Sequence, residues 1–356
     1  MVLLGIDPHK DTHTVVAVDP AGRQLDQTTV AARTLGHGEL VSWARTRWPE
    51  RTWAVEDCRH VTRRLERDLL AAGERVVRVP PALMAGARQA VRTPGKSDPI
   101  DALAVARAAL REPNLPAAQH DQASWEVKLL VDHREHLVAE RTRTINRLRW
   151  HLHQLDPDLE RATRRLPGPG LRRIAAWLDQ ASPQAASPVQ VGICRDQVTA
   201  ISSLTSQVSE LDRQLRHRVA RLAPTLLGLP GCGPLTAAKL IAETAGVARF
   251  RSEACFAMHA GVAPVPVSSG RTDRHRLSRG GNRQLNAALH RIAITQLRLP
   301  SPGQTYYQRR RAQGDATGEA VRALKRRIAR AVYQHLKQAQ PPPATAAAAA
   351  LDRGAT

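Results

Sequence analysis

The first 115 residues alternate short β-forming runs with stretches of helical periodicity. Apolar and β-branched residues predict strands at 2–6, 14–19, 24–30, 52–55 and 75–79. Apolar residues at helical spacing predict a helix near 40–48 and another over 61–70, ended by Gly73. Three successive strands, a helix, a strand, a helix and a strand is the element order of an RNase H-like fold. We therefore predict an RNase H-like α/β domain over residues 1–115.

The middle of the chain, residues 120–222, has the pattern of long helices. Residues 124–155 form a basic helical stretch, and heptad spacing connects Ile201, Leu204, Val208, Leu211, Leu215 and Leu222. This spacing predicts a helical coiled-coil insert. An antiparallel hairpin within the chain and an intermolecular coiled coil both satisfy it. Pro167–Gly170 and Ser182–Pro188 have the composition of loops and separate the two helices.

The third region, residues 223–337, is expected to be mostly helical. Leu-Pro-Gly-Cys-Gly-Pro at 229–234, followed by a helical run over 236–244, resembles a helix-hairpin-helix turn. Glycines in such a turn let backbone amides approach a phosphate. Another helix is expected over 285–297. The Pro/Ala-rich residues 338–356 are expected to be a disordered tail.

The charge balance indicates the class of partner. Lys+Arg 53 against Asp+Glu 32 gives a formal net charge of +21. Fifteen Arg or Lys and three Asp or Glu lie between Ser268 and Tyr333. Such a surplus favours nucleic acid, held through its backbone phosphates. No apolar run is long enough to span a membrane, and four scattered cysteines fit a reducing cytoplasm.

Four acidic residues stand at the ends of predicted elements. Asp7 follows the first strand and Glu56 the fourth, while Asp98 and Asp101 open a helix with both carboxylates on one side. Any one of them alone is explained as a cap or a strand end. In an RNase H-like arrangement the four converge, and clustered carboxylates stay ionised only beside cations. We therefore expect a site for two Mg²⁺ ions about 4 Å apart, which would hold the attacking and leaving oxygens of a phosphodiester.

Other polar residues nearby are expected to lie outside this site. Asp57 could replace Glu56, but it points to the opposite face of the strand. Asp11 and His13 fall in the predicted turn between the first two strands and are expected to be solvated. His9 and His13 have i, i+4 spacing without a third ligand, so we expect no zinc site.

A serine-containing segment precedes the basic region. It runs from Gly261 to Arg271 and includes Ser268-Ser269-Gly270. A serine hydroxyl needs activation to act as a nucleophile, and neighbouring guanidinium groups would stabilise transition-state charge on a phosphate. From the residues alone, a Ser/Gly turn beside a phosphate-binding patch is the simpler interpretation. If a serine is the nucleophile, chemistry alone does not exclude Ser268 or Ser278 in place of Ser269. The residues expected to bind nucleic acid are Arg271, Arg274, Arg276, Arg279, Asn282, Arg283, Arg309, Arg310 and Arg311.

Motifs from both halves of the chain occur together in one known family. They are Gly5-Ile6-Asp7 with His9-Lys10, Val55-Glu56, residues 96–102, 229–234 and 261–264, Ser269-Gly270, residues 279–283 and Tyr306-Tyr307. Together they resemble the bridge-RNA-guided recombinases of bacterial insertion sequences and the related site-specific DNA invertases. The resemblance covers about residues 1–335.

The resemblance implies a RuvC-like DEDD domain and a C-terminal transposase domain. In the first, Asp7, Glu56, Asp98 and Asp101 would bind Mg²⁺. In the second, Ser269 would attack DNA and form a covalent phosphoserine link. Two departures are visible: Ser268 directly precedes the implied nucleophile, and Pro99 changes the helix entry while both aspartates are kept. The implied partners are donor and target DNA, a structured guide RNA and further copies of the chain, as a dimer to tetramer.

The leading interpretation is a transposase that moves its own insertion sequence by Mg²⁺-dependent strand exchange. One alternative is a RuvC-like Holliday-junction nuclease that hydrolyses with water and needs no serine. Another is a non-catalytic nucleic-acid-binding protein with a vestigial acidic site. The variant Ser269→Ala separates the first two, and the effect of divalent ions on thermal stability tests the third.

Overall fold

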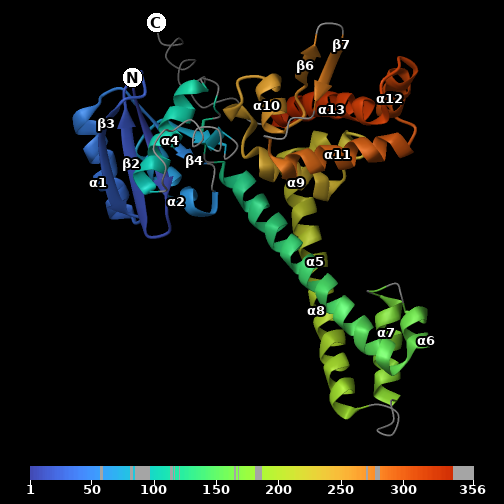
Figure 1. Ribbon diagram of the computed structural model, residues 1–356. Coiled ribbons are helices and arrows are strands. Elements are labelled where there is room, and N and C mark those ends of the chain that lie inside the picture. Colours follow the sequence, from blue (N-terminus) through green and yellow to red (C-terminus); the bar gives the residue numbers. More distant parts are fainter. Residues whose placement is uncertain are drawn as a thin grey trace, which may run out of the picture. The chain divides into compact units, whose positions relative to one another are not determined.

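The computed structural model describes residues 1–56, 59–80, 83–84, 97–112, 115, 117–119, 121–163, 166, 168–180, 187–269, 272–276 and 281–339. The chain divides into two compact units. One contains residues 1–122 together with those from 244 onward, and the other is Ala123–Glu243 (Figure 1). The expected tail lies outside the described residues, apart from Gln338 and Ala339, which are helical.

Five strands form one mixed sheet in the order β3-β2-β1-β4-β5. β1 (Val2–Pro8) pairs antiparallel with β2 (Thr12–Val18), which pairs antiparallel with β3 (Gln24–Ala31). β4 (Arg51–Glu56) lies parallel to β1, and β5 (Val76–Val79) lies parallel to β4. This order and these directions are those of an RNase H-like fold. The predicted α/β class and its five strands are confirmed.

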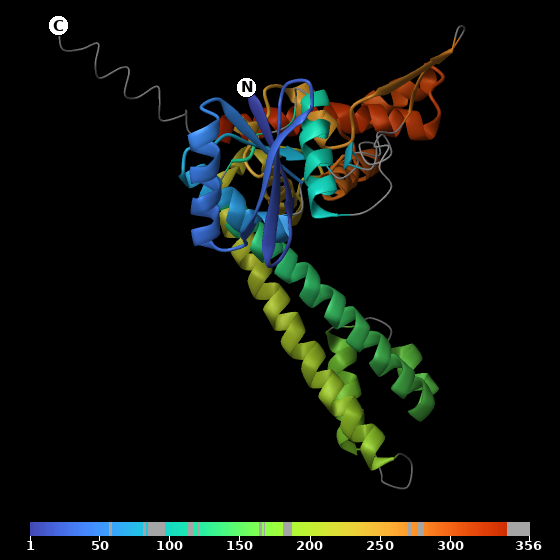
Figure 2. The same cartoon turned by 60° about the vertical axis from the view of Figure 1, so that its left-hand side comes forward.

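Alternation along the strands divides the core of this domain into two layers. The layer that packs against α1 (Thr34–Arg47) and α2 (Arg59–Ala71) includes Leu4, Ile6, Trp53 and Val55. The layer that packs against α4 (Asp98–Arg111) includes Leu3 and Ala54. Gly5 also lies on the α4 side, where an added Cβ would stand 2.2 Å from the backbone oxygen of Ala102. The missing side chain therefore lets α4 lie directly on β1 (Figure 2).

The unit Ala123–Glu243 is built on two long helices. Bonds from α5 (Gln122–Leu155) to α8 (Pro188–Leu222) join Glu126 to Arg218 and Gln154 to Gln190, so the two helices run antiparallel. α6 (Pro157–Ala162) and α7 (Pro169–Gln180) pack at one end of this pair, around Leu148, Ile174 and Cys194. The heptad residues Ile201, Val208, Leu211 and Leu215 are buried within the chain. An intermolecular coiled coil remains a prediction.

Both loop expectations in this unit are wrong at their last residues. Pro169 and Gly170 open α7, although their composition is that of a loop. A proline is tolerated in the first turn of a helix, because the N–H that it lacks would have no helical partner there. Pro188 opens α8 for the same reason, and Ser187 rather than Pro188 is the residue before the helix.

The chain from Pro224 onward is mostly helical, as expected. It contains η1 (Pro224–Gly228), α9 (Pro234–Thr244), η2 (Val247–Arg249), α10 (Glu253–His259), α11 (Arg283–Arg298), α12 (Pro302–Ala312) and α13 (Thr317–Ala339). The rings of Phe250, Phe256 and Tyr333 pack together where η2, α10 and α13 meet. A two-stranded hairpin of β6 (Val265–Ser269) and β7 (Thr272–Arg276) is the one sheet in this part of the described chain, and the sequence pattern did not predict it.

Candidate metal centre and nucleic-acid interface

Asp7 and Glu56 lie on the same face of the sheet. Residues alternate between the two core layers along β1 and β4, so Asp7 follows Leu3 and Gly5 to the α4 side, and Glu56 follows Ala54. The parallel register pairs Ile6 with Val55, one residue before each carboxylate. The two acidic residues therefore lie on neighbouring strands at the same edge of the sheet.

The first turn of α4 adds two further carboxylates. Asp98 and Asp101 both lie in this turn, and Asp101 is buried. Ser97 is the N-cap residue by position, but its side chain makes no capping hydrogen bond. The Asp98 carboxylate instead lies beside His9. Neither Ser97 nor Asp98 is thus explained as a simple helix cap.

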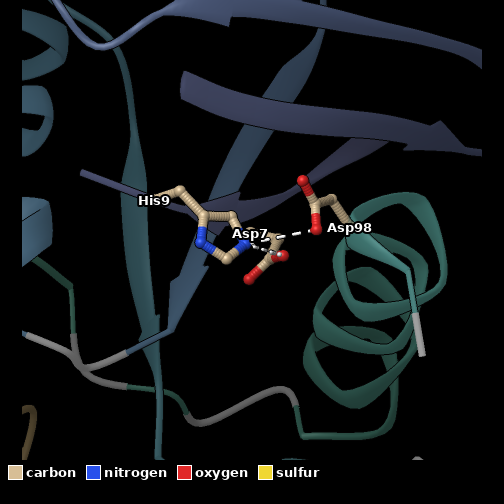
Figure 3. Close-up of side chains that lie close together, drawn as sticks. All are labelled: Asp7, His9 and Asp98. Carbon is tan, nitrogen blue, oxygen red and sulfur yellow. Dashed lines mark hydrogen bonds and ion pairs between the residues drawn. The ribbon is translucent and has the colours of Figure 1, made fainter. Parts of the chain in front are cut away.

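Asp7, His9 and Asp98 form a compact cluster (Figure 3). The Nε2 atom of His9 lies 3.1 Å from Oδ2 of Asp7 and 3.3 Å from Oδ1 of Asp98. The candidate ligand atoms of all three residues lie within 4.8 Å of one another. The Asp7 side chain is only 9% exposed, whereas those of His9 and Asp98 are about half exposed. One buried and two accessible ligand groups therefore meet at one point.

The surroundings of Asp7 disfavour a bare negative charge. Burial is the largest effect and raises the pKa of Asp7, the charges of Asp101 and Asp98 raise it further, and His9 opposes the shift. A carboxylate in such a place is stabilised by an added cation. Carboxylate oxygens are the ligands that Mg²⁺ prefers, so the donor set fits a divalent cation. Asp101 acts on Asp7 electrostatically, but neither it nor Glu56 belongs to the three-residue cluster found among the described residues.

His9 is a site residue that sequence analysis missed. It follows Asp7 by two residues, and strand periodicity places residues i and i+2 on the same face. This spacing is the available signal, whereas the sequence analysis considers His9 only together with His13 as a zinc ligand and finds no third ligand. His13 pairs with Pro8 across β1 and β2 and so lies on the face of the sheet opposite Asp7.

The expectation that His13 is solvated is wrong. β2 begins at Thr12, so His13 lies in the strand rather than in the turn. Its ring is buried and stacks on the ring of His37 from α1, with centroids 5.2 Å apart. The Nδ1 atom of His37 is bonded to Asp68 at 2.7 Å. Burial, and to a lesser degree His37, lowers the pKa of His13 to about 4.

The serine candidates lie in and around the β6–β7 hairpin. Ser268 and Ser269 are the last residues of β6, and their backbones pair with Asp273 and Thr272. The two serines thus belong to a strand, and Gly270, the other member of the expected Ser/Gly turn, lies outside the described residues. Ser278, Arg271 and Arg279 lie outside the described residues, as does Asp57. Arg274 and Arg276 belong to β7.

The remaining residues expected to bind nucleic acid differ in their contacts. Asn282 caps α11, accepting bonds from the backbone N–H groups of Gln284 and Leu285, and Arg283 is exposed at the first position of that helix. In α12, the guanidinium of Arg310 lies 2.5 Å from Asp315, and Arg311 donates to the backbone oxygen of the same residue.

Arg309 is placed differently from these two neighbours. Its guanidinium lies over the ring of Tyr306, 5.3 Å from the centroid, and Arg327 of α13 lies 5.1 Å from the same centroid. Tyr306 is therefore flanked by two guanidinium groups, which form a basic and aromatic surface on α12 and α13.

Comparison with known proteins identifies the class and then the family. A family model described as a transposase matches residues 4–157, and a model described as the transposase IS116/IS110/IS902 family matches residues 223–308. The first match contains all four acidic residues, and the second contains the β6–β7 hairpin. The chain is a transposase. It belongs to the IS116/IS110/IS902 family of insertion-element transposases.

Individual relatives agree with this assignment. The IS110 43.6 kDa protein of Streptomyces coelicolor is 30% identical over 68% of this chain and 71% of its own length. The IS116 44.8 kDa protein of Streptomyces clavuligerus is 29% identical over 92% of both chains. The IS900 42 kDa protein of Mycobacterium paratuberculosis is 29% identical over 98% of this chain and 99% of its own.

A solved structure of T. thermophilus RuvC in complex with a Holliday junction substrate also matches. It has 18% sequence identity and a TM-score of 0.26, and the match covers 33% of this chain and 99% of that one. The RNase H-like assignment given above rests on the strand order and directions instead. No helix among the described residues is both long and apolar enough to cross a membrane.

Proposed function

We propose that this transposase cuts and rejoins DNA through a covalent serine intermediate, with a divalent-cation site at the Asp7 edge of its sheet. The Asp7–His9–Asp98 cluster on an RNase H-like sheet is the observation that carries the proposal. It supports the metal site because a buried carboxylate with two acidic neighbours is unfavourable without a cation. Membership of a transposase family supports DNA as the substrate.

Asp7 and Asp98 would hold the cation, with Glu56 and Asp101 available at the same edge. We propose Mg²⁺ as the ion, with two ions when all four carboxylates take part. When bound, the ions would stabilise the charge that develops on phosphate oxygens. His9 touches both Asp7 and Asp98, so it would hold the two carboxylates in place.

The proposed nucleophile is Ser269, and the support for it is the family resemblance of Ser269-Gly270 and its place at the end of β6. Its Oγ attacks a DNA phosphorus, forming a P–Oγ bond as the bond to a sugar oxygen breaks. The serine proton passes to a base, and the departing oxygen takes up a proton. A hydroxyl of another DNA strand then attacks the phosphoserine and releases the serine. Phosphoester bonds are exchanged in equal number, so no external energy source is required.

The proposed partners extend beyond DNA. The surplus of arginine between Ser268 and Tyr333 fits the phosphates of DNA and also those of a structured guide RNA. A homo-oligomer, from dimer to tetramer, is proposed from the family resemblance and the long helical insert. The reaction would move the insertion sequence that encodes the chain.

The experiment uses the full-length protein, Mg²⁺, RNA transcribed from the DNA that flanks the reading frame, and labelled DNA that spans the element ends. We expect a covalent protein–DNA adduct that survives denaturing electrophoresis. Ser269→Ala should abolish the adduct, and the neighbouring Ser268→Ala is the matched control. Asp7→Asn should abolish adduct formation while DNA binding persists.

The alternative with water as nucleophile predicts a different outcome. A RuvC-like nuclease with the same acidic cluster would cleave DNA at full rate in Ser269→Ala and would give no adduct in any variant. That result would remove the serine mechanism and keep the metal site. Loss of the adduct in Ser268→Ala alone would move the nucleophile by one residue.

A further inference from the structure

The β6–β7 hairpin is part of a long connection between α10 and α11, called the excursion, whose two ends lie against each other. The excursion leaves at Ala260-Gly261 and returns at Gly281-Asn282. The backbone N–H of Asn282 donates to the oxygen of His259 at 2.6 Å. A Cβ added at Gly281 would lie 2.2 Å from the nitrogen of Gly261, so only glycine fits there, and Gly261 itself has a φ of 64°. The described ends of the excursion are thus held against each other.

One side chain of α11 holds the outgoing end. The Nδ2 atom of Asn286 donates to the backbone oxygens of Ala260 and Gly261, at 2.9 and 3.0 Å. Because carbonyl oxygens only accept hydrogen bonds, these two contacts fix which side of the amide faces the loop. The Oδ1 atom of Asn286 must therefore point the other way, toward Lys325 of α13, whose Nζ lies 2.5 Å from it.

Lys325 is an unusual lysine for a buried position. The residue is only 6% exposed, and burial lowers the pKa of its ammonium, with Arg322 adding to the effect. Its hydrogen-bond partner among the described residues is the neutral amide of Asn286. Burial and then the charge of Lys325 lower the pKa of the neighbouring His290, so no negative charge is supplied from that side. Lys239, which is 4% exposed, instead meets both carboxylate oxygens of Glu135, at 2.8 and 2.9 Å. A buried ammonium without a carboxylate is costly, and an apolar side chain would fill the space at lower cost.

The contacts explain what the costly lysine does. A charged donor bonds more strongly than a neutral one, so Lys325 holds the Asn286 amide in a single orientation. In that orientation both N–H donors of the amide are directed at the two consecutive carbonyls from which the excursion starts. Only three residues lie between Gly261 and Val265, the first residue of β6. The orientation of the amide is thereby coupled to the start of the strand that carries both serines.

We propose that Lys325 and Asn286 are positioning residues that fix the base of the β6–β7 hairpin and so set where the backbone of Ser268 and Ser269 lies. The proposal rests on the proposed function, in which this hairpin presents the nucleophile. The two residues act through the loop and do not touch the DNA. The chemistry requires a positioned hydroxyl, and misplacement by about 1 Å costs about a hundredfold in rate.

The test compares three variants of the full chain in the adduct assay. The bonds of Asn286 to Lys325, Ala260 and Gly261 are called the clamp. Lys325→Met keeps the side-chain volume and removes the ammonium, and Asn286→Leu removes all three bonds. Lys337→Met is the control. Lys337 is exposed near the end of the same helix, so its loss removes the same charge and leaves the clamp intact. We expect adduct formation at saturating DNA to slow by about 10- to 100-fold in the first two variants. The DNA Kd should change less than about twofold in all three.

Asn286→Asp separates positioning from stability. It keeps an oxygen for Lys325 and makes the pair ionic, but it loses both N–H donors and sets a carboxylate against two carbonyl oxygens. We expect adduct formation to slow in this variant as well, without a lower melting temperature. Hydrogen exchange of the amides of Gly261, Val262 and Ala263, which are bonded to α10, should quicken in every clamp variant and stay unchanged in Lys337→Met.

The possible outcomes are distinct. Unchanged exchange and unchanged adduct rate in Lys325→Met would overturn the proposal. Weaker DNA binding with a shallower salt dependence would also overturn it, because Lys325 would then be a phosphate ligand. If the wild-type chain forms no adduct at all, the proposed function fails. The exchange measurement still decides whether Lys325 and Asn286 hold the hairpin.

Discussion

His9 Nε2 lies 3.3 Å from Oδ1 of Asp98, although one residue follows β1 and the other opens α4. The contact exists because α4 approaches β1 closely enough to bring its first turn to the edge of the sheet where Asp7 lies. That approach depends on Gly5, which has no side chain to separate the helix from the strand. The close packing of α4 against Gly5 therefore also brings the acidic residues of the site together.

Gly5→Ala should therefore damage the site from within the core. The added Cβ would stand 2.2 Å from the oxygen of Ala102 and 2.5 Å from the nitrogen of Ala106, both of which are backbone atoms. The helix must move, which costs about 1–3 kcal/mol of stability and carries Asp98 away from Asp7. We expect a lower melting temperature and loss of the stabilisation by Mg²⁺, measured by thermal unfolding with and without the ion.

Gly38→Ala is the matched control for this prediction. Gly38 lies in α1 of the same domain with no heavy atom within 4 Å of an added Cβ. Replacing glycine by alanine inside a helix should stabilise it by up to about 1 kcal/mol. If Gly5→Ala keeps a normal response to Mg²⁺, close packing of α4 is not what assembles the site.

Asp7→Asn should separate the stability of the metal-free protein from its response to metal. Burial and the charges of Asp101 and Asp98 raise the pKa of Asp7, so its ionised form is unfavourable in the folded chain. A neutral amide removes that repulsion. We expect the metal-free melting temperature to rise and the Mg²⁺-induced increase to disappear. The exposed Asp11, changed to Asn, should leave both quantities as they are.

Much of this acidic edge could be predicted from the sequence. Runs of β-branched residues predict the strands. Asp7 and Glu56 follow two predicted parallel strands, whose carboxyl ends lie at the same edge of the sheet. The i, i+3 spacing of Asp98 and Asp101 gave their shared side. The exact membership of the compact cluster could not be predicted, because it depends on how deeply α4 packs over Gly5.

The wrong prediction for His13 and the unpredicted β6–β7 hairpin both have causes in the local sequence. His13 was assigned to a turn because β2 begins two residues earlier than its apolar pattern suggests, at Thr12. The β6–β7 hairpin was missed because Pro266 and Ser268-Ser269-Gly270 have the composition of a turn. Pro266 is tolerated there because a two-stranded hairpin consists of edge strands, which leave N–H groups without partners in any case.

The buried His13 should make the N-terminal domain sensitive to acid. Its folded pKa is about 4, while an unfolded histidine titrates near 6.5. The unfolded state therefore binds the proton first as the pH falls. The contribution of His13 is complete above about pH 6.5 and is lost progressively toward pH 4, by at most about 3 kcal/mol. Native-state hydrogen exchange of the β2 amides, corrected for intrinsic rates, measures this loss.

His13→Phe tests the cause of that sensitivity. The phenyl ring keeps an aromatic partner for His37 and has no proton to gain, so the loss of stability between pH 6.5 and 4 should become smaller. His133→Phe, at an exposed position of α5, should leave the dependence as in the wild type. An equally steep loss in His13→Phe would assign the acid sensitivity to other groups.

Arg309 and Arg310 are adjacent in α12 and should differ in their effect on nucleic-acid binding. Among the described residues, Arg309 has no ion pair and lies over Tyr306, while Arg310 is paired with Asp315 at 2.5 Å. A guanidinium already held by a carboxylate has little to gain from a phosphate. Arg309→Ala should therefore weaken binding and reduce the slope of log K against log salt by about 0.9, which corresponds to one phosphate contact.

Arg310→Ala carries the same change in charge at the next position, which makes it the internal control for Arg309→Ala. We expect it to leave the salt slope within error and to lower the melting temperature slightly, because the bond that joins α12 to Asp315 is lost. Arg327→Ala should resemble Arg309→Ala, since both guanidinium groups flank one ring. Titration of DNA at several salt concentrations measures all three slopes. Equal slopes for Arg309→Ala and Arg310→Ala would show that overall charge, rather than the surface around Tyr306, governs binding.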